Sequence, residues 1–561
     1  MTRPTSSRIG WTDGVLLVGI TGVIVTTTFL VYSSADVPVV DDWTYAWSVE
    51  HYLHTRTLRI LEWSAHYPLA QILWGSVFSW LLGFSFVALR LSTVVLAWAG
   101  LVAFFLTLRE LGIGGSLAAL GTLTIWCNPV FFVLSHSFMT DIPLVSIMNA
   151  TMLFYVRWVK RERTWDLLIA SGLTTVAFLI RQIGAVFALV PLGCLLLTRL
   201  RERERPAVPW SQLVCLLVPF LGIGLMLCWI KVVHGETRVY MEKASNLRWV
   251  LFLSGWFYVK ELLHVLMHLG LVLCPLTWIA LGRLSKRTMA GAAAVLTILI
   301  GLVLWREGPL DNPLGIMLTW NELGFADGLI TREPAGRQLP LWIRAAVLAV
   351  SLSGAAAIMS ALWDGFRRWG RSVRKPATVL LLNSLLQGLL LGVLWLFYDR
   401  YYLPLLPGVI ALLMGALRPT RAVTIIGLIG VLLWGAIAVS GTMDQFHLQE
   451  TVAEAHARLL RQGVTPENID AGYAMNGWWL YAHARSGPPR RGHEPEVPWI
   501  TGWTLLPYRI AGAAESPYTV VYRVPWRPLW ARSDAVYVLE HTAELERSGL
   551  PSLRSRDREG R

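Results

Sequence analysis

The chain has 561 residues, of which 55% are hydrophobic and only 15% are charged, and its mean hydropathy is +0.52. A soluble globular protein carries roughly 25% charged residues, so this composition excludes a soluble enzyme, a disordered scaffold and a disulfide-stapled secreted domain. The net charge of +13 does not indicate nucleic-acid binding, because the basic residues form short clusters between apolar segments, where such clusters orient membrane helices.

Apolar runs of about 20 residues, the length that spans a bilayer, recur over the first 440 residues. The first run begins near Gly14, follows two arginines and precedes no convincing cleavage site, so it predicts a spanning helix instead of a signal peptide. Twelve further spans are predicted at 87–107, 115–133, 143–158, 166–180, 183–198, 210–232, 261–282, 288–305, 341–363, 376–397, 402–417 and 422–440.

Residues 68–83 are also apolar enough to span, and counting them would invert every later loop. If they lie in the outer interface instead, the loops assigned to the cytoplasm hold 19 Lys and Arg in 51 residues, and the outer segments hold 11 in 112. Cytoplasmic loops carry an excess of basic residues. We therefore predict an interfacial helix at 68–83, thirteen spans in all, and a C-terminus on the outer side.

Beyond about residue 440 the chain becomes polar and proline-rich. A helix is predicted near 447–462, and the alternating runs 518–524 and 535–541 predict strands. The predicted fold is an all-α polytopic membrane bundle over residues 1–440, whose outer loop 34–86 carries interfacial helices. A small α/β or α+β domain on the outer face follows over residues 441–561 and ends in a disordered tail.

Three carboxylates stand at the predicted outer mouths of spans. Asp41 and Asp42 lie in the first outer loop, with Tyr45 close behind, and Asp141 opens the span after the second outer loop. Ionisable groups at such positions are costly and favour a functional role. The alternative is that each aspartate only caps the following helix.

Arginines lie on the same predicted face in two turns so short that they barely leave the membrane. Arg181 follows the span 166–180, and Arg400 precedes the span 402–417, beside Asp399. Arginine suits bidentate contact with a phosphate group. Snorkelling to the lipid headgroups is the alternative, and Asp399 is a candidate to neutralise Arg400.

These pieces, in this order, resemble the GT-C polytopic glycosyltransferases of the protein O-mannosyltransferase and aminoarabinose transferase types. The resemblance covers about residues 30–405. Its motifs are Asp41-Asp42, His66-Tyr-Pro-Leu69, Phe86-Val-Ala-Leu-Arg-Leu91, Met139-Thr-Asp-Ile-Pro143, Arg181-Gln182 and Arg400-Tyr-Tyr-Leu-Pro404. Two positions depart from the family pattern: Thr44 stands where the aminoarabinose-type enzymes have arginine, and Tyr67 replaces the first proline of a Pro-Pro pair.

The resemblance implies an integral-membrane transferase that takes a sugar from a polyprenyl-phosphate donor. Asp41 would be the base that accepts the proton of the acceptor hydroxyl, with inversion at the anomeric carbon. Asp42 and Asp141 complete the predicted catalytic set, with Asp141 orienting the acceptor. His66, Arg181, Arg400 and Tyr45 are the predicted substrate-binding residues, and the arginines would stabilise the departing phosphate.

A divalent cation remains an open alternative. Asp41, Asp42 and Asp141 offer the oxygen ligands that Mg or Mn prefers, and His66 with His136 would suit zinc. No spacing enforces either site, so no metal is assigned.

The predicted partners are a polyprenyl-phosphate sugar, membrane lipids and a lipid, glycan or protein acceptor. Asp470, Tyr473 and Asn476 with their aromatic neighbours are typical of an acceptor-sugar site or of a folded core, and the loop 306–340 is a candidate lid.

The rival functions are a lipid-sugar flippase or transporter and a non-catalytic assembly protein. The expected location is a bacterial inner membrane, with the site facing the periplasm.

Overall fold

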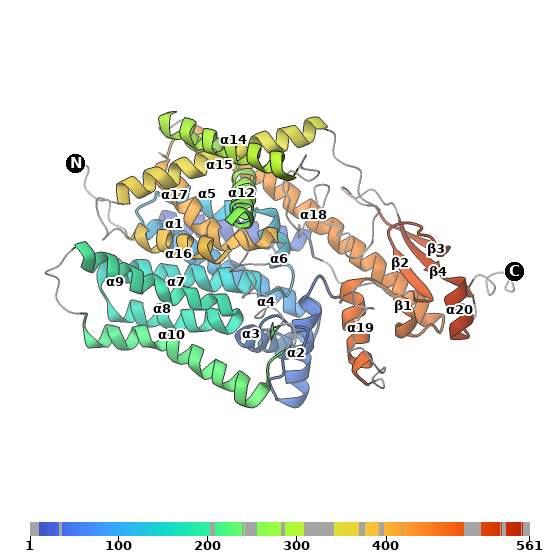
Figure 1. Ribbon diagram of the computed structural model, residues 1–561. Coiled ribbons are helices and arrows are strands. Elements are labelled where there is room, and N and C mark those ends of the chain that lie inside the picture. The colour runs from blue at the N-terminus through green and yellow to red at the C-terminus, as the bar shows by residue number, and fades with distance from the viewer. Residues whose placement is uncertain are drawn as a thin grey trace.

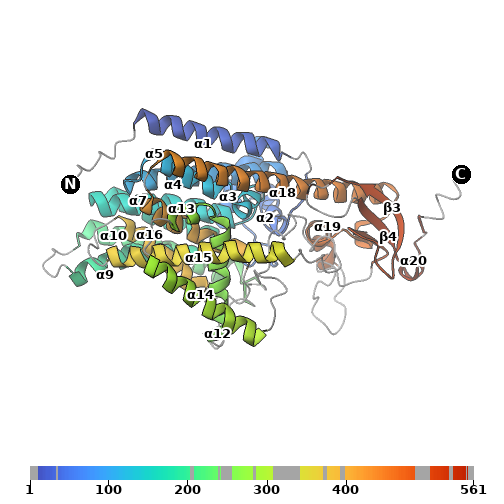
Figure 2. The same ribbon diagram turned by 90° about the horizontal axis from the view of Figure 1, so that it is seen from above.

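A helical bundle and a small sheet, joined by one long helix, make up the computed structural model (Figures 1 and 2). The structure describes residues 10–32, 36–201, 208–237, 240–241, 255–281, 286–307, 341–369, 376–391, 398–417, 419–486, 506–527, 529, 535–550 and 552–553. Residues 308–340 of the candidate lid and the predicted disordered tail lie outside these ranges.

The described residues of the first half of the chain are mainly helical. Its elements are α1 (Trp11–Leu30), α2 (Asp42–Thr55), α3 (Leu69–Leu82), α4 (Phe86–Glu110), α5 (Gly115–Trp126), α6 (Pro129–Ser135), α7 (Asp141–Arg161), α8 (Thr164–Ile180), the 3-10 helix η1 (Gln182–Ala188), α9 (Leu189–Arg201), α10 (Trp210–Trp229), the π-helix η2 (Ile230–His234) and α12 (Gly255–Val272). The next helices are α13 (Leu276–Leu281), α14 (Lys286–Glu307), α15 (Leu341–Trp369), α16 (Ala377–Leu391), the 3-10 helix η3 (Asp399–Leu405), α17 (Leu406–Ala416) and α18 (Arg421–Arg461).

The chain is an integral membrane protein, but the count of thirteen spans is not confirmed. Among the described residues, eight helices are long and apolar enough to cross a bilayer, or nine if the bent pair α5–α6 is one span. The predicted span 115–133 is broken by 68°. The break has a local cause, because the side chain of Asn128 caps the N–H groups of Val130 and Phe131 and Pro129 starts the second helix.

Helix α3 occupies the ambiguous segment. It has 14 residues, which at 1.5 Å per residue gives about 21 Å, whereas the hydrocarbon core is about 30 Å thick. It is therefore too short to span on its own. Its Gln71 donates a hydrogen bond of 2.8 Å to the carbonyl of Phe138, which fastens the helix to the loop that precedes α7.

Helices α4 and α7 pack at very short range. A Cβ atom added to Gly100 of α4 would lie only 2.4 Å from the Cα of Ser146 in α7. Small residues allow this close approach of backbones in membrane proteins, where packing takes over from the hydrophobic effect as the main force between helices. The contact sets the position of Asp141, the first residue of α7, relative to α4.

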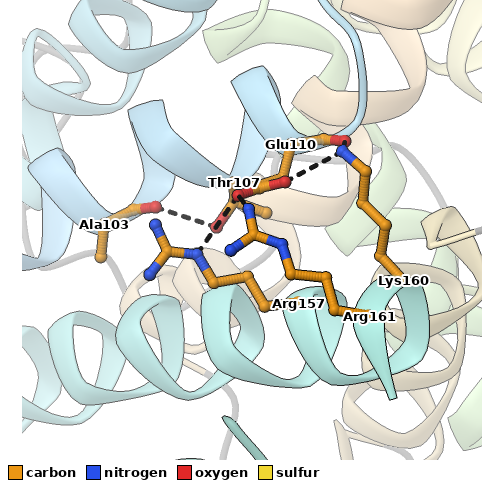
Figure 3. Close-up of polar contacts among 6 residues, drawn as sticks. All are labelled: Ala103, Thr107, Glu110, Arg157, Lys160 and Arg161. Atoms are coloured by element: carbon orange, nitrogen blue, oxygen red, sulfur yellow. Dashed lines mark hydrogen bonds and ion pairs between the residues drawn. The ribbon is translucent and has the colours of Figure 1, made fainter. Parts of the chain in front are cut away.

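At the other ends of these two helices, three basic side chains of α7 surround one carboxylate of α4 (Figure 3). Glu110 accepts from Lys160 at 2.9 Å and from Arg157 at 3.3 Å, and it also pairs with Arg161. The glutamate side chain is only 7% exposed, whereas its partners are 21–34% exposed. The cluster joins α4 to α7 at the end of the bundle opposite Asp141.

Replacing Glu110 by glutamine should lower the free energy of unfolding by about 1–2 kcal/mol, because three partly solvated cations lose their shared counter-charge. Thermal unfolding in detergent measures the change. Glu544→Gln is the control, since its partner Arg547 is 75% exposed and such pairs contribute little. Equal unfolding midpoints for the two variants would contradict the prediction.

The last helix of the bundle continues into the polar part of the chain. Helix α18 has 41 residues, or about 61 Å, about twice the thickness of the hydrocarbon core. The predicted span 422–440, the predicted helix near 447–462 and the predicted domain boundary near residue 440 therefore lie in one helix. It runs from the bundle to the C-terminal sheet (Figure 2).

The sheet has the order β1-β2-β4-β3, with β1 parallel to β2 and the other pairs antiparallel. The elements of this part are η4 (Pro466–Asn468), β1 (Ile469–Asp470), α19 (Tyr473–Ser486), β2 (Tyr508–Ala511), β3 (Thr519–Pro525), β4 (Ala535–Glu540) and α20 (Thr542–Ser548). The two alternating runs of the sequence form β3 and β4. One hydrophobic core buries Val452 and Leu459 of α18 together with Val536 and Val538 of β4.

Candidate active site

The segment between α1 and α2 presents Asp41 through a strained turn. Val40 has φ = 56°, a left-handed conformation that costs energy for a β-branched residue. Asp41 is the N-cap residue of α2, but its side chain makes no capping hydrogen bond. The capping alternative therefore does not explain its side chain, which points elsewhere.

The Asp41 carboxylate meets residues from two distant parts of the chain. Its Oδ1 accepts a hydrogen bond of 2.6 Å from the hydroxyl of Tyr473 in α19. Its Oδ2 lies 3.7 Å from Nη2 of Arg400 in η3, and its side chain is 32% exposed. Asp41 is thus both anchored and open to solvent.

Asp141 enters the same cluster from α7. Its Oδ1 forms a buried ion pair with Arg181, and its Oδ2 lies 3.9 Å from Nε of Arg400. The two carboxylates that the sequence placed on different outer loops therefore approach the same guanidinium. Asp141 is not the N-cap residue of α7, because Thr140 holds that position and Asp141 is the first residue of the helix.

The guanidinium of Arg400 lies between these carboxylates with its side chain 11% exposed, and its buried Nε has no hydrogen-bond partner. The separations of 3.7 and 3.9 Å from the carboxylate oxygens exceed hydrogen-bonding distance. The rings of Tyr398 and Tyr401 lie 4.6 and 5.7 Å from the guanidinium carbon and hold it by cation–π attraction. The site therefore contains a positioned cation with a spare donor.

Tyr45 belongs to the same cluster of carboxylates and arginines. It is buried in α2, and its pKa is raised above the ordinary value by burial and by the Asp41 carboxylate. Arg181, Asp141 and Arg400 act on it as well. The phenol therefore stays protonated and remains a hydrogen-bond donor.

Asp42 points away from this cluster. Its Oδ1 accepts from the N–H of Val39 at 2.7 Å, and the side chain is fully buried. Burial raises its pKa to about 7, although Arg90 opposes the shift. Arg90 in turn donates to the carbonyl of Val37, so Asp42 and Arg90 hold the segment between α1 and α2 against α4.

Asp42 should make stability depend on pH. The folded-state pKa of about 7 exceeds the unfolded value of about 3.9, so the native state keeps a proton that the unfolded chain loses. The contribution of Asp42 to the free energy of unfolding is then fully present below pH 4 and falls as the pH rises from 4 to 7. Asp42→Asn should be more stable than the wild type at pH 8, by up to about 4 kcal/mol, and similar at pH 4. Unfolding midpoints measured across this range test this, and a pH-independent difference would contradict it.

His66 lies in the connection between α2 and α3, where its backbone N–H and carbonyl contact the hydroxyl of Ser64. The neighbouring Tyr67, at the position of the family's proline, accepts from the N–H of Thr237 at 2.7 Å. This connection is thereby tied to the segment after α10.

The described residues contain no group of three or more His, Cys, Asp and Glu side chains placed to hold a metal ion. Both oxygens of Asp141 face arginines, and Asp42 is turned toward Val39. His136 uses its ring nitrogens on Phe132 and Thr28. The residues proposed as metal ligands therefore do not fit a shared ion, and no step below involves one.

Tyr473 is the site residue whose role the sequence did not indicate. It lies 432 residues from Asp41, and its pattern of aromatic neighbours fits a folded core as well as a sugar site. No local signal connects it to the segment between α1 and α2.

The described helices thus form a membrane bundle with a cluster of carboxylates and arginines at the start of α7. Residues 68–229 match the family model described as dolichyl-phosphate-mannose-protein mannosyltransferase. The resemblance to GT-C glycosyltransferases that the motifs indicated is thus confirmed for that part of the chain. No curated protein sequence matches the chain.

Solved structures give similar matches at low identity. The protein O-mannosyltransferase complex Pmt1–Pmt2 of S. cerevisiae, bound to its sugar donor, is 16% identical with a TM-score of 0.33; the match covers 39% of this chain and 33% of that one. ArnT of Cupriavidus metallidurans, bound to undecaprenyl phosphate, is 14% identical with a TM-score of 0.44, over 96% and 99%. The Archaeoglobus fulgidus oligosaccharyltransferase is 14% identical with a TM-score of 0.45, over 78% and 55%.

Proposed function

We propose that this protein is a GT-C-type membrane glycosyltransferase that moves one sugar from a polyprenyl-phosphate carrier to an acceptor hydroxyl, with inversion. The observation that carries the proposal is the guanidinium of Arg400, whose buried Nε has no hydrogen-bond partner and which faces both Asp41 and Asp141. An anionic phosphate beside a carboxylate base is what such a transfer requires. The matched segment 68–229, which contains Asp141 and Arg181, supports the same reading.

We infer the reaction from the positions of Asp41 and Arg400 in this cluster. The acceptor oxygen forms a bond to the anomeric carbon while its proton passes to Asp41. The bond from the anomeric carbon to the phosphate oxygen breaks, and its electron pair leaves with the polyprenyl phosphate. Charge grows on that phosphate, and the spare donor of Arg400 is positioned to stabilise it. A single displacement of this kind inverts the anomeric centre.

The remaining residues support these two groups. Arg181 is paired directly with Asp141, so we assign to this pair the placing of Arg400 and the orientation of the acceptor. Tyr45 offers a protonated phenol to the bound sugar phosphate. Thr44, at the position of the family's arginine, donates to the carbonyl of Asp41, which leaves phosphate contact to Arg400. Asp42 holds the loop, and His66 stays a candidate contact from the α2–α3 connection.

Orientation follows from charge. Glu110, Arg157, Lys160 and Arg161 lie at the ends of α4 and α7 opposite Asp141, and basic clusters mark the cytoplasmic side. We therefore propose that the site and the C-terminal segment 441–561 face away from the cytoplasm, which is the periplasmic side in the bacterial inner membrane that we predict as the location. The polyprenyl tail would enter from the bilayer, with its phosphate at the interface.

Purified protein in proteoliposomes tests the proposal. The probes are polyprenyl-phosphate mannose and polyprenyl-phosphate arabinose, labelled in the sugar, with envelope extract as acceptor. Transfer of label to the extract with release of polyprenyl phosphate, lost in Asp41→Asn, is the expected result. Movement of intact carrier across the bilayer without release, unaffected by that substitution, would identify a transporter and refute the transferase.

A further inference from the structure

Helix α19 of the C-terminal segment packs directly on the helix that follows Asp41. A Cβ atom added to Gly477 would lie 2.3 Å from the indole of Trp43 in α2, so only glycine allows this approach. The ring of Tyr481 lies 5.7 Å from the same indole. Trp43 is 1% exposed. The contact is therefore a packed interface between segments more than 400 residues apart.

A hydrogen-bonded chain crosses this interface and ends on Asp41. The indole N–H of Trp63 donates to the hydroxyl of Tyr473 at 2.9 Å, and that hydroxyl donates to Oδ1 of Asp41 at 2.6 Å. Indole is only a donor, so the tyrosine oxygen must accept from Trp63. Its single proton is then directed at the carboxylate.

The chemistry of Tyr473 keeps this direction in place. Its pKa is raised well above the ordinary value, first by burial and then by the negative charge of Asp41. The phenol therefore stays protonated over the working pH range. A short hydrogen bond from a neutral donor to an ionised carboxylate is stronger than one between neutral groups.

The start of α19 is itself held by the C-terminal sheet. Asn476 donates to Oδ1 of Asp470 in β1 at 2.9 Å and accepts from the N–H of Ala471 at 2.9 Å. Arg509 of β2 pairs with Oδ2 of the same aspartate at 3.1 Å. These contacts fix the turn that precedes Tyr473. The sheet thus determines where the phenol stands.

We propose that Tyr473 is a positioning residue for Asp41 and that the C-terminal segment completes the active site. The proposal rests on the role assigned to Asp41 above. Tyr473, fixed by Trp63, donates to Oδ1 and orients the carboxylate, so that Oδ2, the oxygen nearer to Arg400, is the atom that takes the acceptor proton. The two oxygens of Asp41 therefore have different roles. The hydrogen-bonded chain runs from Trp63 through Tyr473 to Oδ1, which leaves Oδ2 for the acceptor proton.

The test compares Tyr473→Phe, Trp63→Phe and the double variant in the full-length protein, with the labelled donors named above. Tyr473→Phe should lower kcat about 10- to 100-fold with donor KM within about twofold, and the acidic limb of the kcat profile should move to higher pH by about one unit. Trp63→Phe should have a smaller effect in the same direction. The double variant should not lower kcat further than Tyr473→Phe does, because both substitutions act through the hydroxyl proton of Tyr473.

Tyr518→Phe is the matched control. It removes a hydrogen bond of 3.0 Å from a phenol to the carbonyl of Leu506 in the same C-terminal segment, and it should leave kcat and the pH profile unchanged. Hydrogen–deuterium exchange of peptides over residues 39–47 gives a second readout that needs no substrate. Exchange there should be faster in Tyr473→Phe than in the wild type or in Tyr518→Phe.

The outcomes separate this proposal from the one it rests on. If Asp41→Asn abolishes transfer but Tyr473→Phe leaves kcat, the pH profile and exchange at 39–47 unaltered, the positioning role is refuted and the transferase stands. If Asp41→Asn itself keeps full activity, the assigned base is wrong. Unchanged exchange in Tyr473→Phe overturns the positioning role even for a protein that accepts neither probe sugar.

Discussion

Asp41→Asn should lower kcat by about 100- to 10,000-fold, the usual contribution of a general base, while the KM for the donor changes little. Asparagine retains the shape of the side chain and an oxygen that can accept the Tyr473 hydrogen bond, but it cannot take up the acceptor proton. The measurement is initial-rate kinetics with the labelled donors in proteoliposomes. The expected loss is therefore one of chemistry and not of binding.

Two variants make this result specific. Asp41→Glu keeps the carboxylate but moves it, so partial activity should remain. Asp444→Asn alters another buried aspartate, which lies in α18 away from the cluster. Its two oxygens accept from the N–H of Leu529 at 2.8 and 2.9 Å. The kcat of this variant should be unchanged. Equal loss in Asp41→Asn and Asp444→Asn would indicate general damage to the fold and would count against the base.

Asp141→Asn is expected to destabilise the protein by about 3–5 kcal/mol, because it leaves the positive charge of Arg181 buried without its partner. The side chains of Asp141 and Arg181 are only 5% and 7% exposed, so solvent does not replace the lost interaction. Activity should fall with stability, since Arg400 loses one of the two carboxylates that flank it. Thermal unfolding and the kcat of the folded fraction measure the two effects separately.

The double variant Asp141→Asn with Arg181→Gln tests the cause. Removing both charges should recover much of the lost stability, because no uncompensated charge stays buried. It should not recover activity, since Arg400 would still lack the carboxylate of Asp141. Additive losses of stability from the two single variants would show that the pair does not act as a unit.

Local patterns were sufficient for the outline of the protein. Hydropathy runs located helices such as α4 and α7, since burial in lipid requires about 20 apolar residues whatever the rest of the chain does. Period-2 alternation located β3 and β4, because side chains of a strand point alternately to opposite faces. The break at Asn128–Pro129 was missed, although a capping residue followed by proline was there to indicate it.

What the sequence by itself determined is a helical membrane protein with acids and arginines at the mouths of its spans, because hydropathy and charge act locally along the chain. Only the tertiary structure decided which of two adjacent aspartates faces the cluster. Asp41 is open to Arg400 while Asp42 is buried against Val39, and the strained turn at Val40 sets that choice. It also placed Tyr473 on Asp41 across 432 residues, a contact that depends on how α19 packs on α2 and that no short stretch of sequence encodes.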